Sequence, residues 1–420
     1  MKTTLKRSLA LMISVLLLAL SLAACGRTEV NPAPVSAESA AAAAESAPEA
    51  PELPAGSAFE AAEDPAESTP ESYTVAIRDI RKHGNVILDT DFDTMNAHGM
   101  EIGDIITATV GEKSFCLPIG TAHPDVDSGS MLCRFDTEDN EVSLAINMGS
   151  FASEAGIGEK VSIEEEPGYR WDVAIGEVTL SLKEKQGYRA EYDARNLTRT
   201  NERADYPALT DEEFSNFRAV AAAGIREDWL YRSSTPIEPA LGRNEYAMAA
   251  MEKAGIRAVV NLDDSVEEMQ GYPAYPGSWY SRCAVVNPEM TYDFGTGEFA
   301  GKVKQSVLFL LENDGPFLIH CKEGKDRTGI LCAILECFAG ASAEEVTGDY
   351  MLTYANFYGI LPGDGAYDVI LSNNLVKTLC GLYGIDSLNG TDLQKEAADY
   401  LLSTGLDETQ LHQLAAKLGA

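Results

Sequence analysis

Basic residues are scarce in this chain of 420 residues. It has 32 lysines and arginines against 66 aspartates and glutamates, which gives a formal net charge of −34 at pH 7. This balance argues against a nucleic-acid partner, because binding to a phosphate backbone needs a basic face. It argues equally against broad electrostatic adhesion to anionic lipid. Any phosphate chemistry must therefore come from a local pocket that works against the overall field.

Large apolar side chains are almost missing from residues 26–72, where Ala, Glu, Pro and Ser dominate. Such a segment cannot bury enough surface to offset its ordering entropy, so residues 25–72 are predicted to be a disordered tether. Ahead of it, a basic start precedes an uncharged apolar run over 9–24. The run is short for a membrane span and ends in small residues before Cys25, which is the layout of a secretion signal.

The ending "LAAC" of this signal resembles the lipobox of bacterial lipoproteins, in which a signal peptidase cuts before the cysteine. The resemblance implies that residues 1–24 are a lipoprotein signal peptide and that Cys25 carries a lipid anchor. The protein would then sit on the extracytoplasmic face of a bacterial cell membrane. An ordinary signal peptide and a membrane span are the alternatives.

Residues 73–192 are predicted to form a small all-β barrel, because short β-rich runs such as "DIITATV" and "VSLAINM" alternate with Gly, Asp and Asn. Asp89, Asp91 and Asp93 alternate in "DTDFDT", but the glycine and final glutamate of a calcium loop are missing. A solvated strand edge is therefore favoured over a cation site. Since the chain carries an export signal, Cys116 and Cys133 either pair or stay free.

The stretch from "GNVILDTDFDT" to "GEKVSI" loosely resembles the C-terminal β-barrel of S-adenosylmethionine hydroxide adenosyltransferases. The catalytic domain of those enzymes is not evident in this chain. The resemblance implies a binding or scaffolding module.

Strand and helix patterns alternate over residues 200–420. This alternation predicts an α/β domain with a mostly parallel sheet flanked by helices. The expected strands are 256–262, 283–287 and 317–320, and the expected helices are 246–255, 297–314, 328–340, 391–405 and 407–419.

The turn after the strand 317–320 reads "CKEGKDRTG". Amide groups of residues 322–327 can point into this turn, and the following helix adds its positive end. Gly324 permits the tight backbone path. Arg327, six residues after Cys321, can reach the same place and hold two phosphate oxygens. Because the same positive field favours a thiolate at Cys321, the turn is predicted to bind phosphate and to supply the nucleophile that attacks it.

The spacing His-Cys-x5-Arg resembles the signature of the cysteine-dependent protein-tyrosine phosphatase superfamily. With "GKDRTG" it looks most like the bacterial secreted tyrosine and lipid phosphatases. The landmarks "NFR" (216–218) and "LYRS" (230–233) are also similar, whereas "NLDD" (261–264) departs from the family's Asp-Leu-Arg element. The resemblance covers about 200–420.

The resemblance implies a phosphomonoester hydrolase that acts on phosphotyrosine proteins, phosphoinositides or inositol phosphates through a phosphocysteine, with no cofactor and no metal. One alternative is a catalytically weak phosphate-binding surface lipoprotein whose β domain is the main functional module. A rhodanese-type sulfurtransferase also uses a loop cysteine, but Arg327 followed by Thr-Gly argues against it.

The resemblance also assigns roles within the motif. Cys321 is the expected nucleophile, Arg327 holds the phosphoryl oxygens, Thr328 hydrogen-bonds the sulfur and His320 orients the loop. Asp326 is the favoured general acid, with Glu289 and Asp293 as alternatives. Substrate binding is assigned to the remaining positions, which are Lys322, Glu323, Gly324, Lys325 and Gly329.

Lys322 and Lys325 stand where the similar "CKAGKGR" loop of phosphoinositide 3-phosphatases has lysines that meet additional phosphates. Glu323 and Asp326 depart from that loop, and both weaken its positive field. The other interpretation of Lys322 is that it simply faces solvent.

Overall fold

A computed structural model of the chain describes residues 72–164 and 167–419. The predicted signal peptide, Cys25 and all but the last residue of the predicted tether lie outside the described residues. Within the described ranges, no helix has the length and apolarity needed to cross a bilayer.

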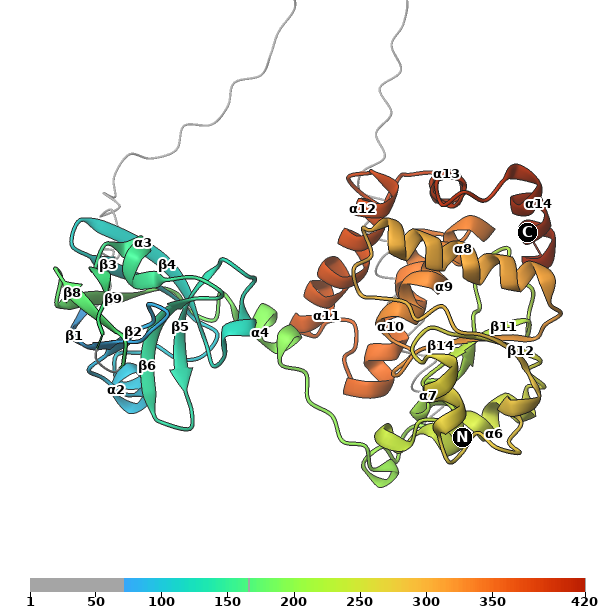
Figure 1. Cartoon of the computed structure of the whole chain (residues 1–420), viewed down its shortest axis with the longest axis horizontal. Coiled ribbons are helices and arrows are strands. Elements are labelled where there is room, and N and C mark those ends of the chain that lie inside the picture. The colour runs from blue at the N-terminus through green and yellow to red at the C-terminus, as the bar shows by residue number, and fades with distance from the viewer. Residues whose placement is uncertain (1–71, 165–166, 420) are drawn as a thin grey trace, which may run out of the picture. The chain divides into compact units, whose positions relative to one another are not determined.

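Seven strands close into a barrel in the order β1-β2-β6-β5-β4-β3-β9 (Figure 1). Neighbouring strands pair antiparallel, except for the parallel pair of β4 and β5. In β3 the side chains of Ile106, Ala108 and Val110 point into the barrel core, and the residues between them are less buried. This period of two confirms the predicted all-β barrel. The strands are β1 (Ser72–Ile80), β2 (Val86–Leu88), β3 (Ile105–Val110), β4 (Lys113–Gly120), β5 (Met131–Asp136), β6 (Glu141–Ile146) and β9 (Glu177–Glu184).

Short elements complete the barrel domain. They are α2 (Phe92–Ala97), η1 (His123–Asp125), α3 (Phe151–Ala155), the ribbon of β7 (Gly158–Ser162) and β8 (Tyr169–Val173), and α4 (Arg189–Arg195).

Two sequence-based interpretations in the barrel can now be settled. The Asp91 carboxylate caps α2 by accepting a hydrogen bond from the Thr94 amide at 2.8 Å, so assigning Asp91 to a strand edge was wrong. Cys116 is an exposed free thiol and Cys133 a buried one, so the two do not form a disulfide. The role of Asp91 is therefore to cap α2, because a carboxylate accepts hydrogen bonds from the free amides at the start of a helix.

The second domain is built on a five-stranded sheet in the order β10-β11-β14-β12-β13. β10 is antiparallel to β11, and the other four strands are parallel, which confirms the predicted mostly parallel sheet. β14 is the central strand, and all four of its residues are buried. The strands are β10 (Arg218–Ala219), β11 (Leu230–Ser233), β12 (Ala258–Asn261), β13 (Ala284–Val286) and β14 (Phe317–His320).

Helices cover both faces of this sheet (Figure 1). Alternation along β14 sends Phe317 and Ile319 to the face beneath α8, α9 and α10, and Leu318 to the face covered by α6 and α7. The longer helices are α6 (Asn244–Lys253), α8 (Gly297–Glu312), α9 (Asp326–Ala339), α10 (Ala343–Tyr358), α13 (Leu393–Ser403) and α14 (Glu408–Leu418). The shorter ones are η2 (Arg203–Asp205), α5 (Asp211–Phe214), η3 (Pro239–Leu241), α7 (Val266–Gly271), η4 (Tyr280–Arg282), α11 (Gly365–Ile370), the π-helical η5 (Leu371–Val376) and α12 (Lys377–Tyr383).

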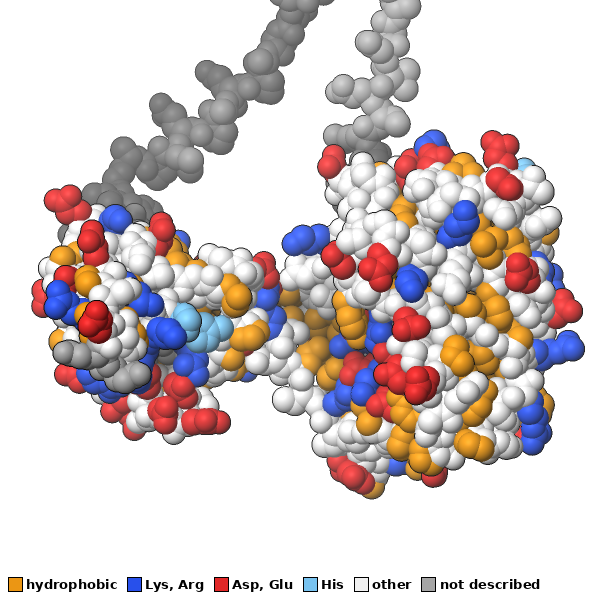
Figure 2. Space-filling model, in the orientation of Figure 1, with side chains coloured by type: hydrophobic (Ala, Val, Ile, Leu, Met, Phe, Trp, Pro, Cys, Tyr) orange, Lys and Arg blue, Asp and Glu red, His pale blue; other side chains and the backbone are white. Residues whose placement is uncertain are grey.

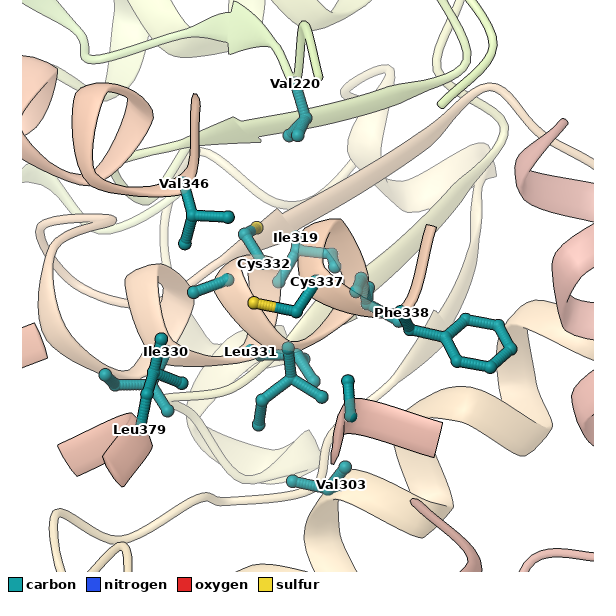
Figure 3. Packing of buried hydrophobic residues seen from close by; sticks show 14 of the residues in the cluster. Val220, Val303, Ile319, Ile330, Leu331, Cys332, Cys337, Phe338, Val346 and Leu379 are labelled. Atoms are coloured by element: carbon teal, nitrogen blue, oxygen red, sulfur yellow. The ribbon is translucent and has the colours of Figure 1, made fainter. Parts of the chain in front are cut away.

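α9 is the interior helix that the unbroken apolar pattern predicts. Every residue of α9 except Asp326 is buried. Figure 3 shows Ile330, Leu331 and Cys337 packed among side chains such as Val303 of α8 and Leu379 of α12. Because its whole length is enclosed, α9 is held firmly, and so is the loop at its N-terminal end.

Candidate active site

The loop 321–327 connects the central strand β14 to the start of α9. Gly324 adopts φ +68°, a conformation that side-chain-bearing residues rarely accept. A Cβ atom on Gly324 would lie 2.1 Å from the Ser233 carbonyl oxygen, a backbone atom at the end of the neighbouring strand β11. The glycine is therefore required by both the conformation and the close approach of the two strand ends.

Three consecutive carbonyl groups of the loop, those of Lys322, Glu323 and Gly324, have hydrogen-bond partners outside it. The Lys322 carbonyl accepts from the Thr235 amide at 3.1 Å. The Glu323 carbonyl accepts from the Asn216 side-chain amide at 3.2 Å. The Gly324 carbonyl accepts from Asn216 at 3.3 Å and from the Arg232 guanidinium at 2.9 Å. In a trans peptide the N–H points opposite to the C=O, so these bonds turn the following amides towards the inside of the loop.

A buried ion-pair network holds Asn216 and Arg232, which donate hydrogen bonds to these carbonyls, in place. Asp349 on α10 lies 2.5 Å from Arg232 and 2.8 Å from Arg218. Although burial opposes its ionisation, the two arginines hold the pKa of Asp349 well below its usual range. Arg218 in turn donates to the Asn216 side-chain oxygen at 2.6 Å. The shape of the loop is thus fixed by residues from three other segments of the chain.

Arg327 is buried and points into the same site, with a side chain that is 7% exposed. Its Nη2 lies 2.6 Å from Asp263 Oδ1 and donates to the Tyr292 hydroxyl at 2.9 Å. Its Nη1 donates to the carbonyls of Leu262 and Met290. Burial opposes the charged form, but Cys321, Asp263 and Tyr292 outweigh it and raise the pKa of Arg327 above its ordinary value. Its buried Nε has no hydrogen-bond partner among the described residues.

Cys321 and Thr328 lie on either side of this arginine in sequence, and both are buried. Cys321 is a free thiol. The buried Thr328 hydroxyl has no hydrogen-bond partner within the described part of the chain. Together with Arg327 Nε, it leaves two polar groups of the site free to bind a ligand.

His320 is fully buried behind the loop. Its Nε2 lies 2.7 Å from the Tyr280 hydroxyl, and its Nδ1 lies 3.3 Å from the Cys321 carbonyl oxygen. Burial lowers the pKa of His320 from 6.5 to about 4, so the ring is neutral at pH 7. A neutral ring with both nitrogens engaged holds its neighbours in place and is not set up to transfer protons.

The two loop lysines are paired with carboxylates. Lys322 Nζ lies 2.8 Å from Glu238, and Lys325 Nζ lies 3.2 Å from Glu323. Glu323 also pairs with Arg199 at 2.6 Å. Gly329 lies one helical turn after Lys325, packed against the ring of Tyr350. A Cβ atom on Gly329 would come within 2.6 Å of that ring.

The three candidate general acids occupy different settings. Asp326 is the first residue of α9, with its side chain 31% exposed and 3.7 Å from Lys325 Nζ. Burial raises the pKa of Asp326 above its ordinary value. Glu289 and Asp293 are both exposed. Asp326 also lines a pocket whose walls include the aromatic residues Tyr292, Phe294, Tyr350, Tyr354 and Tyr358.

Several residues at this site did not emerge from the sequence. Asp263 was noted only as a departure from a motif, yet it is the carboxylate that contacts Arg327. Asp349 lies on α10, a helix that the sequence analysis did not predict, although Ser342 and Glu345 form a capping box at its start. No local signal marks Glu238 or Tyr292, because their partners are distant in sequence.

Comparison with known proteins bears on this domain. Residues 211–362 match the family model described as "Tyrosine phosphatase family". No curated protein matches the chain.

Three solved structures are similar to parts of the chain. TpbA from P. aeruginosa in complex with phosphotyrosine is 18% identical, with a TM-score of 0.27, over 43% of this chain and 88% of its own. The catalytic core of the PP-IP phosphatase SIW14 from S. cerevisiae is 18% identical, with a TM-score of 0.25, over 38% of this chain and 85% of its own. An uncharacterised conserved protein from Thermotoga maritima is 20% identical, with a TM-score of 0.22, over 26% of this chain and only 36% of its own.

The family match and the geometry of the loop concern the same part of the chain. The matched residues include β11, β12, β14 and the whole loop 321–327. Residues 211–362, which contain this loop, therefore match the tyrosine phosphatase family.

Proposed function

We propose that the protein is a phosphomonoester hydrolase in which Cys321 is the nucleophile. The observation that carries the proposal is the outward anchoring of the loop carbonyls by Asn216, Arg232 and Thr235. It turns the opposite amides inward, next to a buried arginine whose Nε is unpaired among the described residues. Inward amides and a guanidinium suit the oxygens of a phosphoryl group, whose charge is spread in the transition state.

The proposed reaction has two steps. The Cys321 thiolate forms a bond to phosphorus while the bond from phosphorus to the leaving oxygen breaks, and Asp326 gives its proton to that oxygen. Water then attacks phosphorus, the sulfur–phosphorus bond breaks, and the proton from water returns to Asp326. Arg327 holds the phosphoryl oxygens throughout, and the Thr328 hydroxyl donates a hydrogen bond to the departing sulfur.

The raised pKa of Asp326 favours this role for the residue. An acid must still hold its proton when the leaving oxygen needs it, and burial keeps the Asp326 proton to higher pH than an exposed aspartate would. Asp326 is also the candidate that lines the aromatic pocket beside the loop. Glu289 and Asp293, which are exposed, lack this environment.

The test uses the full chain with para-nitrophenyl phosphate and phosphotyrosine peptides as substrates. We expect wild-type protein to hydrolyse both and Cys321→Ser to lose activity by at least about a thousandfold, since the loop without its nucleophile cannot form the intermediate. Cys321→Ser should still bind orthovanadate or phosphate. Rapid quenching with a labelled substrate should trap phosphate on wild-type protein only. Binding of phosphate by a wild-type protein with no hydrolysis would favour the alternative of a phosphate-binding module.

A further inference from the structure

Four cations around the loop, Lys322, Lys325, Arg199 and Arg327, each contact a carboxylate, and Arg232 behind the loop shares Asp349 with Arg218. Lys322 pairs with Glu238 at 2.8 Å, and Arg327 pairs with Asp263 at 2.6 Å. Lys325 and Arg199 share Glu323, and Lys325 also lies 3.7 Å from Asp326. Apart from Asp326, the proposed proton donor, three carboxylates face these four cations, so much of the positive charge at the loop is already neutralised.

Glu323 is held in a fixed position. Its two carboxylate oxygens contact different cations, Arg199 at 2.6 Å and Lys325 at 3.2 Å. Arg199 is itself stacked on the rings of Phe357 and Tyr358, with its guanidinium carbon 5.0 and 5.8 Å from their centres. These two contacts hold the Glu323 carboxylate beside Lys325, where it would repel a second anion.

Lys325 is committed to this arrangement as well. Its side chain is 18% exposed, and its ammonium lies over the rings of Tyr354 and Tyr358 at 5.6 and 5.4 Å. Burial opposes its charge, but Asp326 and the tyrosines and glutamate around it raise the pKa of Lys325 above its usual range. The lysine is charged, and the carboxylate of Glu323 neutralises much of that charge.

Lys322 is held less tightly. Its side chain is 45% exposed, whereas that of its partner Glu238 is only 12% exposed. An ion pair with one exposed member contributes little stability, so the lysine can leave it. The glutamate, however, stays where it is, and a phosphate drawn to Lys322 would meet the negative charge of Glu238.

The part of the site that faces the nucleophile is different. The amides turned inward by the carbonyl anchors and the unpaired Nε of Arg327 provide donors that no carboxylate occupies among the described residues. These donors suit one phosphoryl group. On the face shown in Figure 2, acidic and basic side chains of this domain are likewise interspersed rather than gathered into one basic patch.

We propose that Glu238 and Glu323 determine specificity by neutralising Lys322 and Lys325. The site then takes substrates that carry a single phosphoryl group and disfavours those with further phosphates on neighbouring positions of the same ring. This inference rests on the proposed function and narrows it. It sets aside the expectation that the two lysines bind additional phosphates, because the structure gives each lysine a carboxylate partner.

The test compares two soluble lipids with the same inositol ring, dioctanoyl phosphatidylinositol 3-phosphate and its 3,4,5-trisphosphate. We expect wild-type protein to have a higher kcat/KM for the monophosphate. Glu238→Gln and Glu323→Gln keep the shape of the side chains but remove the charges, and Glu323→Gln retains an acceptor oxygen for only one of its two cations. Each should raise the trisphosphate-to-monophosphate ratio of kcat/KM about tenfold, as expected for a unit charge removed roughly 6 Å from a dianion in a watery setting.

Glu408→Gln is the matched control, because Glu408 is an exposed glutamate at the start of α14, outside the loop. It should leave the ratio unchanged. Inhibition of para-nitrophenyl phosphate hydrolysis by inositol hexakisphosphate gives a second measurement, and it should strengthen in both loop variants. A wild-type preference for the trisphosphate, or an unchanged ratio in both variants, would overturn the inference alone. Wild-type protein inactive on para-nitrophenyl phosphate would instead overturn the proposed function, and the inference with it.

Discussion

Asp263 is predicted to compete with the substrate for Arg327. Its Oδ1 lies 2.6 Å from Arg327 Nη2, and only 20% of the aspartate side chain is exposed. A phosphoryl group bound to the same guanidinium must approach this carboxylate or displace it. Asp263→Asn keeps the size of the side chain and a carbonyl oxygen for Arg327 but removes the competing charge.

The size of the effect follows from the distance. A phosphoryl group that shares the guanidinium with Asp263 places its phosphorus roughly 6 Å from the carboxylate. A dianion at that distance repels a unit charge by about 1.4 kcal/mol at the dielectric constant of water, and by more in a partly buried site. That energy corresponds to about tenfold in affinity. We therefore expect Asp263→Asn to bind anions about ten times more tightly.

The assay measures the inhibition constants of orthovanadate and inorganic phosphate against para-nitrophenyl phosphate at constant pH and ionic strength. Titration of phosphate into the Cys321→Ser background gives the affinity without turnover. The control is Asp386→Asn, which removes an equal charge from an exposed position outside the loop. Unchanged or weaker anion binding in Asp263→Asn would show that Asp263 serves to orient Arg327 and does not compete for it.

Three further predictions concern the loop and its surroundings. Gly324→Ala should destabilise the domain by at least about 3 kcal/mol and abolish hydrolysis, because its Cβ would lie 2.1 Å from the Ser233 carbonyl oxygen. Thermal unfolding and activity measurements on the variant test this prediction. A fully active, equally stable variant would contradict it. The pKa of His320 falls from 6.5 in the unfolded chain to about 4 in the folded one, so the unfolded state binds more protons between these values and stability should fall by up to roughly 3 kcal/mol as the pH drops through this window. Urea unfolding at pH 4 and pH 7 should show that loss in wild-type protein and a smaller one in His320→Asn. Asp326→Asn should lower kcat about a hundredfold for phenyl phosphate but much less for para-nitrophenyl phosphate, because the leaving group of the latter needs no proton. The alkaline limb of the pH–rate profile should also disappear. An unaltered profile would exclude Asp326 as the acid.

The local parts of the site could be predicted from sequence because their signals are local. The strand 317–320 was expected with the bounds that β14 has, and the interior helix expected over 328–340 is α9. Both depend on short apolar patterns, and the loop between them has its cysteine, glycine and arginine at fixed spacings.

The sequence indicates structural roles for Asn216, Arg218 and Arg232, but the hydrogen bonds by which they support the loop could not be predicted in this way. Asn216 and Arg232 precede the loop by about a hundred residues, and their hydrogen bonds to its carbonyls depend on how the strands are ordered in the sheet. Asp349 was beyond reach for a second reason, since α10 was not predicted at all. The contact between Asp263 and Arg327 likewise joins the segment after β12 to the first turn of α9, and no periodicity in either segment reveals it.

The outward anchoring of the carbonyls has a consequence for the thermodynamics of ligand binding. Because Asn216, Arg232 and Thr235 hold the loop when the protein folds, its main-chain entropy is lost then and not when an anion arrives. An incoming phosphate therefore meets a receptor that is already rigid. Inactivation on heating should accordingly coincide with melting of the whole domain, with no earlier phase in which the catalytic loop alone comes apart.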